Sequence, residues 1–194
     1  GIPNDYSGVE VGYGDDSFYG TLKRSPNNIF SFIFKDGHID SQINPSKWIN
    51  GKICLIENDN LLWIKDIERP TNAAVSNIGI IALLHTTHEF NNLGGTLSII
   101  EKNGDISFTY EFGSNIEGCA ISSDGSFVSV ATLFPDNSIY FFDIKGKSLQ
   151  WKYKNHIQRE PVLGLEFTEN QLDGFTGHSI ATMEKSKAIG IDGV

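Results

Sequence analysis

The sequence is poor in the residues that cross-link small secreted domains. Its 194 residues include two cysteines, Cys54 and Cys119, and a single methionine. Both cysteines stand in apolar, strand-like runs, so they are expected to be buried free thiols, with a disulfide as the alternative. The chain also has no Asn-x-Ser/Thr glycosylation site, because the one candidate carries a proline at Pro45. These features leave the cellular compartment open.

Basic clusters and long apolar runs are missing as well. The chain has 24 acidic and 15 basic side chains, a formal net charge of −9, and no more than two consecutive basic residues. A nucleic-acid partner is not expected, because such binding depends on neutralising phosphates. No apolar run approaches the roughly 18 residues that a membrane helix needs, so no membrane partner is expected either.

Helical periodicity is absent, and short runs of β-branched and aromatic residues take its place. Four such runs lie close together, at Cys119–Ile121, Phe127–Thr132, Ile139–Phe142 and Leu149–Tyr153. Two of the connections carry Gly in a turn-forming dipeptide, and the middle one is longer and polar. The stretch 118–153 therefore predicts four antiparallel strands, which is the size of one β-propeller blade.

Two series of turns repeat this unit along the chain with a period of 42–47 residues. The first series comprises Asp36-Gly37, Asn77-Ile78-Gly79, Asp124-Gly125 and Asn170. The second series comprises Gly14-Asp15, Asn58-Asp59, Asn103-Gly104, Lys145-Gly146 and Asp192-Gly193. Asp124-Gly125 and Asn103-Gly104 are expected to be two-residue hairpin turns with glycine at positive φ.

The repeat predicts an all-β fold, a β-propeller or a fragment of one, with four-stranded antiparallel blades of about 45 residues. Residues 1–194 are expected to form one propeller domain or part of one. The expected blades are 8–24 (partial), 28–66, 72–112, 117–154 and 161–194 (partial). Because the total is little more than four blades and the last one ends at a turn, a larger propeller or a homodimer is expected to complete the ring. The alternative is that the N-terminal segment Val9–Leu22 docks on the last blade and closes a four-bladed ring.

Two stretches carry a resemblance to known repeat families. AISSDGSFVSVAT, at 120–132, resembles the first hairpin of WD40-like and TolB-like propeller repeats. SIYFFDIKGKSLQWKYK, at 138–154, resembles the second hairpin of quinoprotein (PQQ-type) repeats, with a Gly-Lys turn and a Trp in the outer strand. The resemblance implies a propeller and says little about activity, because many functions share this architecture.

Candidate functional residues are expected on one face of the propeller. The loops between the second and third strands of a blade, and between blades, emerge there, and loops carry most binding residues. We expect a binding site among His85, His88, Glu89, Asp136, His156, Arg159, Glu160 and His178. Five other residues are assigned to packing and turns instead: Trp63, Trp151, Gly104, Gly125 and Gly146.

Catalytic and metal sites are not predicted. His85 and His88 stand three residues apart at a strand end, where nothing places a third metal ligand, so no metal is expected. No Gly-x-Ser-x-Gly elbow and no phosphate-binding glycine loop occur. Quinoprotein catalysis is disfavoured, because the chain has no adjacent cysteines and one good copy of the hairpin motif. No cofactor is expected.

The favoured function is therefore a non-enzymatic scaffold that binds a protein, peptide or glycan on its loop face. The alternative is an enzyme of hydrolase or lyase type that uses the carboxylates and histidines of the same face. Convergent titratable groups in a pocket would favour the enzyme, whereas a shallow face with exposed apolar side chains would favour binding.

Overall fold

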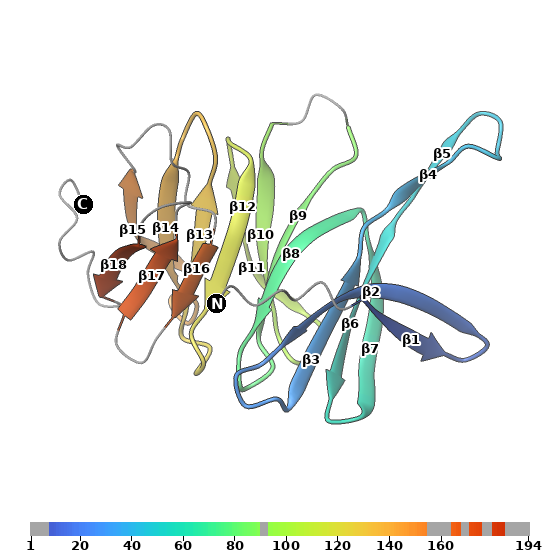
Figure 1. Ribbon diagram of the computed structural model, residues 1–194, viewed down its shortest axis with the longest axis horizontal. Helices are drawn as coiled ribbons and strands as arrows, with labels where there is room; N and C mark the ends of the chain where they lie inside the picture. Colours follow the sequence, from blue (N-terminus) through green and yellow to red (C-terminus); the bar gives the residue numbers. More distant parts are fainter. Residues whose placement is uncertain (1–7, 90–92, 155–163, 168–170, 176–179, 185–194) are drawn as a thin grey trace.

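The computed structural model consists of strands joined by turns and loops, and Figure 1 shows them in a curved row. It describes residues 8–89, 93–154, 164–167, 171–175 and 180–184. No helix occurs among these residues, which also means that none of them belongs to a helix able to cross a membrane. The all-β class expected from the sequence is confirmed.

The described residues form five antiparallel sheets, and the four larger ones follow one another along the chain. The first contains β1 (Gly8–Tyr13), β2 (Asp16–Arg24), β3 (Phe30–Lys35), β6 (Gly51–Glu57) and β7 (Asn60–Ile67). The second contains β8 (Arg69–Val75), β9 (Ile81–Thr86), β10 (Gly95–Ile100) and β11 (Ile106–Phe112). The third contains β12 (Ile116–Ile121), β13 (Phe127–Thr132), β14 (Ser138–Asp143) and β15 (Ser148–Lys154). The fourth contains β16 (Gly164–Phe167), β17 (Gln171–Phe175) and β18 (Ile180–Glu184).

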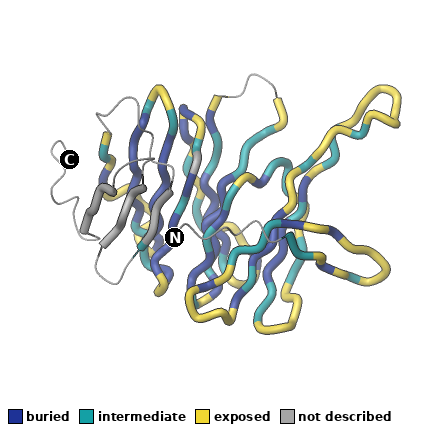
Figure 2. The backbone as a smooth tube through the Cα atoms, in the orientation of Figure 1, coloured by how far each residue is buried: buried dark blue, intermediate teal, exposed yellow. Residues whose placement is uncertain are grey.

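Neighbouring sheets pack face to face, and each of the first three buries apolar side chains against the next. In the second sheet the adjacent residues Leu83 and Leu84 are both fully buried, but Leu83 packs toward the first sheet and Leu84 toward the third. Successive side chains of a strand point to opposite faces, so a strand covered on both sides is apolar at almost every position. Figure 2 shows this burial along the middle of the row.

Phenylalanine and branched aliphatic residues fill both well-described interfaces. The first interface contains Phe30, Phe32, Phe34, Ile53 and Leu55 from the first sheet, with Ala73, Val75, Ile81, Leu83 and Ile100 from the second. The second interface contains Ala82, Leu84, Leu97, Ile99 and Phe112, with Ile121, Val128, Val130, Tyr140, Phe142 and Ile144 from the third sheet. A single sheet could bury neither face by itself, so the stack is what stabilises each blade.

The first sheet differs from the expected blades at its start. Residues 8–24 and 28–66 were expected to lie in separate blades, but β2 pairs with β3, so all of these strands share one sheet. β2 pairs with β1 over Asp16–Thr21 and with β3 over Thr21–Arg24. The β1–β2 hairpin packs Val11 and Phe18 onto Ile33 and Cys54. The hairpin thus covers the face of the first sheet that is turned away from the second.

A second difference concerns Asp36-Gly37, which was expected to be a hairpin turn within a blade. It instead leads into a separate two-stranded hairpin, β4 (His38–Asp40) and β5 (Lys47–Ile49), and the chain then returns as β6 beside β3. The β4–β5 hairpin projects from the row of sheets at the upper right of Figure 1. The 15 residues from 36 to 50 are too many for a tight turn, and within them β4 and β5 pair with each other.

The β2–β3, β8–β9 and β12–β13 turns of the first three sheets are each built on a buried serine. The backbone N–H groups of Ser25, Ser76 and Ser122 donate to the carbonyls of Phe30, Ile80 and Phe127, at 2.9 Å in each case. Each serine Oγ also accepts a backbone N–H from its own turn. The Ser25 turn, rather than Asp36-Gly37, is therefore the first-blade member of this series, because it joins β2 to β3.

The glycine turns are longer than predicted. Gly125 lies in a five-residue connection between β12 and β13, and Gly104 in one of the same length between β10 and β11, so the prediction of two-residue turns is wrong. The predicted positive φ is confirmed at both, with values of 74° and 93°. In the first loop the Ser122 carbonyl accepts the Gly125 N–H, and in the second the Glu101 carbonyl accepts the Gly104 N–H. Each bond closes a tight turn inside the longer loop.

Candidate functional site

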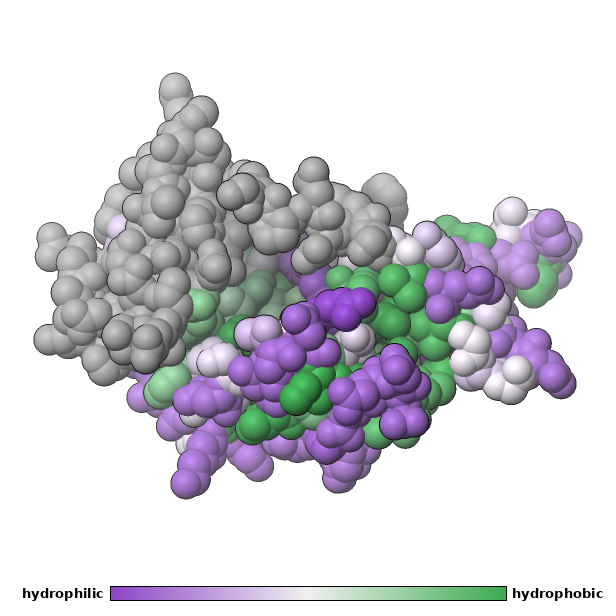
Figure 3. Space-filling model, turned by 60° about the horizontal axis from the view of Figure 1, so that its bottom comes forward, coloured by the Kyte–Doolittle hydropathy of each residue, from purple (hydrophilic) through white to green (hydrophobic). Residues whose placement is uncertain are grey.

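One edge of the sheets carries the connections in which binding residues were expected. We call it the loop face, and its described segments are 36–50, 68, 87–89, 93–94, 113–115 and 133–137, at the upper edge of Figure 1. The opposite edge carries the tight turns, and we call it the turn face. In Figure 3 this lower side is turned forward and shows hydrophilic side chains over much of its area, with hydrophobic areas between them.

A group of interacting side chains lies where the β4–β5 hairpin leaves the loop face, and we call it the hairpin-base cluster: Asp36, Trp48, Glu68, Arg69 and His88. The rings of Trp48 and His88 stack with centroids 4.9 Å apart and an interplanar angle of 7°. The indole N–H of Trp48 donates to the backbone carbonyl of Glu68 at 3.2 Å. Three separate segments are thereby joined: the β4–β5 hairpin, the β7–β8 connection and the loop after β9.

Charge pairs complete the hairpin-base cluster. The backbone N–H of His88 donates to Glu68 Oε1 at 2.9 Å, and the His88 Nδ1 contacts the same oxygen. Arg69 Nε lies 3.3 Å from Asp36 Oδ2, and the Arg69 guanidinium carbon lies 6.0 Å from the centre of the Trp48 ring. The His88 backbone N–H lowers the pKa of the Glu68 carboxyl, and this effect outweighs the opposing effect of burial. The carboxylate therefore stays ionised at neutral pH.

A glycine makes the base of the hairpin possible. A Cβ atom on Gly37 would lie 2.4 Å from Trp48 Cζ2 and 2.6 Å from the backbone oxygen of Glu68. No side chain fits in that space, because both neighbours are held in place by their own contacts. The position of Gly37 thus allows Trp48 to reach the β7–β8 connection.

A polar pocket of about 330 Å³ lies next to the hairpin-base cluster and shares Glu68 with it. We call it the acidic pocket, and its lining is Glu68, His85, Thr86, Thr87, Gly95, Thr96, Glu111 and Phe112. His85 Nε2 lies 2.7 Å from Ser98 Oγ. Burial lowers the pKa of His85 and outweighs the attraction of Glu68, so the imidazole is neutral at pH 7.

Asp136, also expected in the binding site, supports the loop between β13 and β14. Tyr140 and Thr132 donate to its Oδ2 at 2.6 and 3.0 Å, and Ser138 donates to its Oδ1 at 3.0 Å. The Lys152 ammonium lies 2.8 Å from Oδ1. Burial acts to raise the pKa of Asp136, but these four donors together lower it. The carboxylate is already engaged by the protein and belongs to a loop of the third sheet, whereas His85 belongs to the second.

Of the remaining expected site residues, only Glu89 lies in the part of the chain that the structure describes. Glu89 is exposed on the loop after His88. Four others lie outside the described residues: His156, Arg159, Glu160 and His178. Within the part of the chain that the structure describes, no three His, Cys, Asp or Glu side chains gather in the manner of a metal site.

The residues assigned to packing lie in interfaces and turns. Trp63 contacts Phe32, with ring centroids 6.4 Å apart, and its indole N–H donates to the Lys102 carbonyl of the next sheet at 2.9 Å. Trp151 is buried and stacks on Phe141 at 4.9 Å, on the side facing the fourth sheet. Gly146 lies in the β14–β15 turn, where the neighbouring Lys147 rather than the glycine has a positive φ of 50°.

Exposed apolar side chains are present on the loop face, although others, such as Ile78 and Ile106, lie on the turn face. Ile39 and Ile43 on the β4–β5 hairpin are 64% and 46% exposed, Leu93 before β10 is 76% exposed, and Phe134 before β14 is 78% exposed. They belong to the connections between the second and third strands of three successive blades. Water-exposed apolar groups repeated at one edge are typical of a surface that contacts another molecule.

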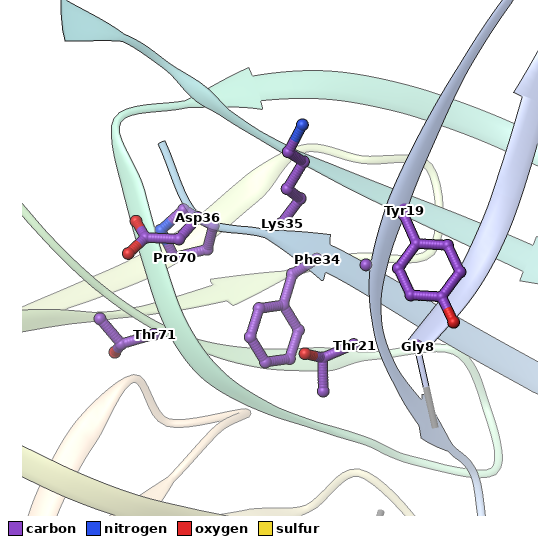
Figure 4. Close-up of a pocket in the computed structure, with 9 residues that line it drawn as sticks. Gly8, Tyr19, Thr21, Phe34, Lys35, Asp36, Pro70 and Thr71 are labelled. Carbon is purple, nitrogen blue, oxygen red and sulfur yellow. The ribbon is translucent and has the colours of Figure 1, made fainter. Parts of the chain in front are cut away.

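A larger hollow of about 500 Å³ lies between β2, β3 and β8, and Figure 4 shows its lining. The Tyr19 ring stands beside Gly8, and a Cβ atom on Gly8 would lie within 1.9 Å of that ring. Thr21, Phe34 and Thr71 line the hollow from three different strands, while Lys35 and Asp36 provide one charge of each sign.

Sequence reasoning missed Trp48 and Glu68, the two residues that hold the site together. Trp48 lies in the segment 28–66, which was interpreted as the strands of one blade, so no separate role was predicted for it. The distance between the apolar runs Phe30–Phe34 and Ile53–Leu55 was a usable signal, because 18 residues between paired strands require an insertion. Glu68 had no signal of its own, since its role depends on the approach of His88.

Similar proteins support the fold. No protein-family model matches the chain, and no curated protein matches it. Among solved structures, it is similar to Chaetomium thermophilum Sqt1 bound to the N-terminus of the ribosomal protein L10, with a TM-score of 0.64 and 14% identity over 89% of this chain and 49% of that one. The mitotic checkpoint complex gives a TM-score of 0.61 with 14% identity over 93% and 58% of the two chains. BamB from Moraxella catarrhalis gives 0.56 with 12% identity over 88% and 49%.

These structures are PQQ-like and WD40 propellers, so the chain has the β-propeller fold and the expected resemblance is confirmed. The chain spans about half the length of the solved structures that it matches. The identities are too low to carry a function across, because unrelated activities share this fold.

Proposed function

We propose that this chain is a binding scaffold whose loop face contacts an extended segment of a partner protein. The observation that carries the proposal is the repeated exposure of apolar side chains there, at Ile39, Ile43, Leu93 and Phe134. An apolar side chain that is mostly in water gains free energy when a partner covers it, by about 25 cal/mol for each Å² removed from water.

The hairpin-base cluster supports the same function by orienting the β4–β5 hairpin. An isolated two-stranded hairpin is marginally stable in water. Here Trp48 fixes it through the stacked His88 ring and the bond to the Glu68 carbonyl. A hairpin ordered before binding costs less conformational entropy when a partner contacts its tip. The solved structures similar to this chain include Sqt1 bound to a segment of a ribosomal protein, which agrees with a protein-binding role.

The other possibilities from the sequence are less well supported by the contacts. A hydrolase or lyase would draw on Glu68 and His88, since Asp136 is engaged by four donors of its own sheet. Stacking of the His88 ring on Trp48 suits a structural or binding role at least as well. A glycan needs polar groups near its hydroxyls, whereas Ile39, Leu93 and Phe134 present apolar surface. A second copy of this chain as the partner is an outcome that the following experiment reports.

Site-specific photo-crosslinking tests the proposal. A benzophenone amino acid replaces Ile39 on the loop face, and the control replaces Ile106, which is 57% exposed on the turn face. We expect the first position to give a discrete product whose partner segment, once purified, binds the wild-type chain and loses affinity for an Ile39→Ser/Phe134→Ser double variant. A disulfide-independent dimer band from position 39 would identify a second copy as the partner. Equal products from both positions, or none from either, would overturn the proposal.

A further inference from the structure

The acidic pocket gives the partner segment a specific chemical feature. Two carboxylates, Glu68 and Glu111, line it, and no lysine or arginine is among its described lining residues. Its volume of about 330 Å³ is at the lower end of the range of about 300–1,000 Å³ for ligand sites.

Strand pairing explains how the pocket is built. Thr96 of β10 pairs directly with Glu111 of β11 on one side and with His85 of β9 on the other. Residues paired across antiparallel strands point to the same face, so these three side chains form a row across the second sheet. The row faces the first sheet, since Leu83 and Ile100, on the same face, pack there. Glu68, on the connection from the first sheet, closes the end of the row beyond His85.

The side chains along the row differ in charge and in the hydrogen bonds that they can make. His85 is neutral and contacts Ser98, so it adds no positive charge near the carboxylates. The Thr96 and Thr86 hydroxyls supply further oxygen atoms. Glu111 is exposed, and the Glu68 side chain is 34% exposed while its Oε1 contacts His88. The pocket therefore presents carboxylate and hydroxyl oxygens, with a carboxylate at each end.

We propose that the acidic pocket receives a basic side chain, lysine or arginine, from the partner segment bound on the loop face. This inference rests on the proposed function and adds the chemistry of one contact to it. A long, thin cationic side chain can lie along the row with its charged head at a carboxylate. Arginine fits best in principle, because its planar guanidinium pairs with a carboxylate through two hydrogen bonds.

The charge of the whole chain also favours a basic partner segment. The formal net charge is −9, which attracts a basic segment over a distance before contact is made. Net charge alone would draw such a segment to any acidic surface, so the experiment has to separate the pocket from the general field.

The test uses acetyl-Gly-Gly-Arg-Gly-Gly-amide as a probe, with a lysine version and a citrulline version of the same peptide. Citrulline has nearly the shape of arginine and no charge. Binding is followed by NMR through the amide signals of His85 and Thr96, which report the pocket itself. We expect both charged peptides to bind at least about tenfold more tightly than the citrulline peptide, since hydrogen bonds to ionised groups are the strong ones.

Matched variants locate the contact. Glu111→Gln should weaken binding of the arginine peptide at least about fivefold, because it removes one charge-assisted partner. Glu101→Gln removes the same charge at the turn end of the second sheet and should leave the affinity unchanged. Equal binding of the arginine and citrulline peptides, or equal effects of the two variants, would overturn the inference. Crosslinking at Ile39 would still be expected in that case. Failure of the inference about the pocket is therefore distinguishable from failure of the proposed function.

Discussion

Trp48 and His88 lie with their rings nearly parallel, 4.9 Å apart, although one belongs to the β4–β5 hairpin and the other to the loop after β9. Stacking of this kind joins two connections of neighbouring blades on the loop face. Glu68 reinforces it from between them, by accepting the Trp48 indole N–H on its backbone and the His88 N–H on its side chain. The hairpin is therefore attached to the propeller through side chains rather than through sheet hydrogen bonds.

Trp48→Ala should release the β4–β5 hairpin without unfolding the propeller. Trp48 is half-buried and lies outside the packed interfaces between sheets, so the loss in unfolding free energy should stay below the roughly 3–5 kcal/mol of a core tryptophan. Hydrogen exchange at the amides that β4 and β5 bond to each other should become faster, while exchange in β9 is unchanged. Trp48→Phe, which keeps an aromatic ring, is the control, and unchanged hairpin exchange in Trp48→Ala would contradict the expectation.

Asp136→Asn should destabilise the third sheet by about 1–3 kcal/mol, because it replaces a carboxylate that accepts from Tyr140, Thr132, Ser138 and Lys152. The folded pKa of Asp136 is lowered, so its stabilisation is present above the ordinary aspartate pKa of about 3.9 and is lost as pH falls through the folded value. Urea unfolding from pH 6 down to pH 3 measures both effects.

The control for that measurement is Asp59→Asn, at the exposed β6–β7 turn. It changes the same net charge and should leave the unfolding free energy within about 0.5 kcal/mol of wild type. An equal loss of stability in the two variants would show that Asp136 has no special role in its loop.

Cys54 and Cys119 should resist thiol reagents in the native protein. Burial raises the pKa of Cys54 to about 11 and that of Cys119 to about 12, so almost no reactive thiolate exists at pH 8. Labelling should reach two thiols only after denaturation. An introduced Ser148→Cys, at an exposed strand end, should react rapidly in the folded chain, and native labelling of Cys119 at a similar rate would contradict the expectation.

Gly125→Ala should cost about 1–2 kcal/mol of unfolding free energy. Gly125 has a φ of 74°, which strains any residue with a Cβ, and the added carbon would lie 3.0 Å from Ile78 Cδ1 of the neighbouring turn. Gly113→Ala is the matched control, because nothing lies within 4 Å of its Cβ position. Chemical denaturation of both variants checks the difference, and equal stabilities would show that the turn can adapt.

Local patterns were enough to determine most strands. Phe127–Thr132 is a strand in the structure with the predicted bounds, and Ile139–Phe142 lies within β14. Strand formation in these runs follows from short-range rules: branched and aromatic residues favour extended backbone, and Gly125 and Gly104 permit the turns beside them. The repeat of these rules along the chain also determined the propeller, since one blade cannot bury its own faces.

Tertiary structure alone decided which strands pair and where the site forms. Asp36-Gly37 directly follows an apolar strand and therefore resembles a blade hairpin turn, but β3 gains more burial by pairing with β6, whose Cys54 and Leu55 are fully buried. The sequence indicated His85 and His88 as residues of the loop face. Their partners Glu68, Ser98 and Trp48 come from other strands and connections, and such contacts depend on how the sheets stack, which no local pattern contains.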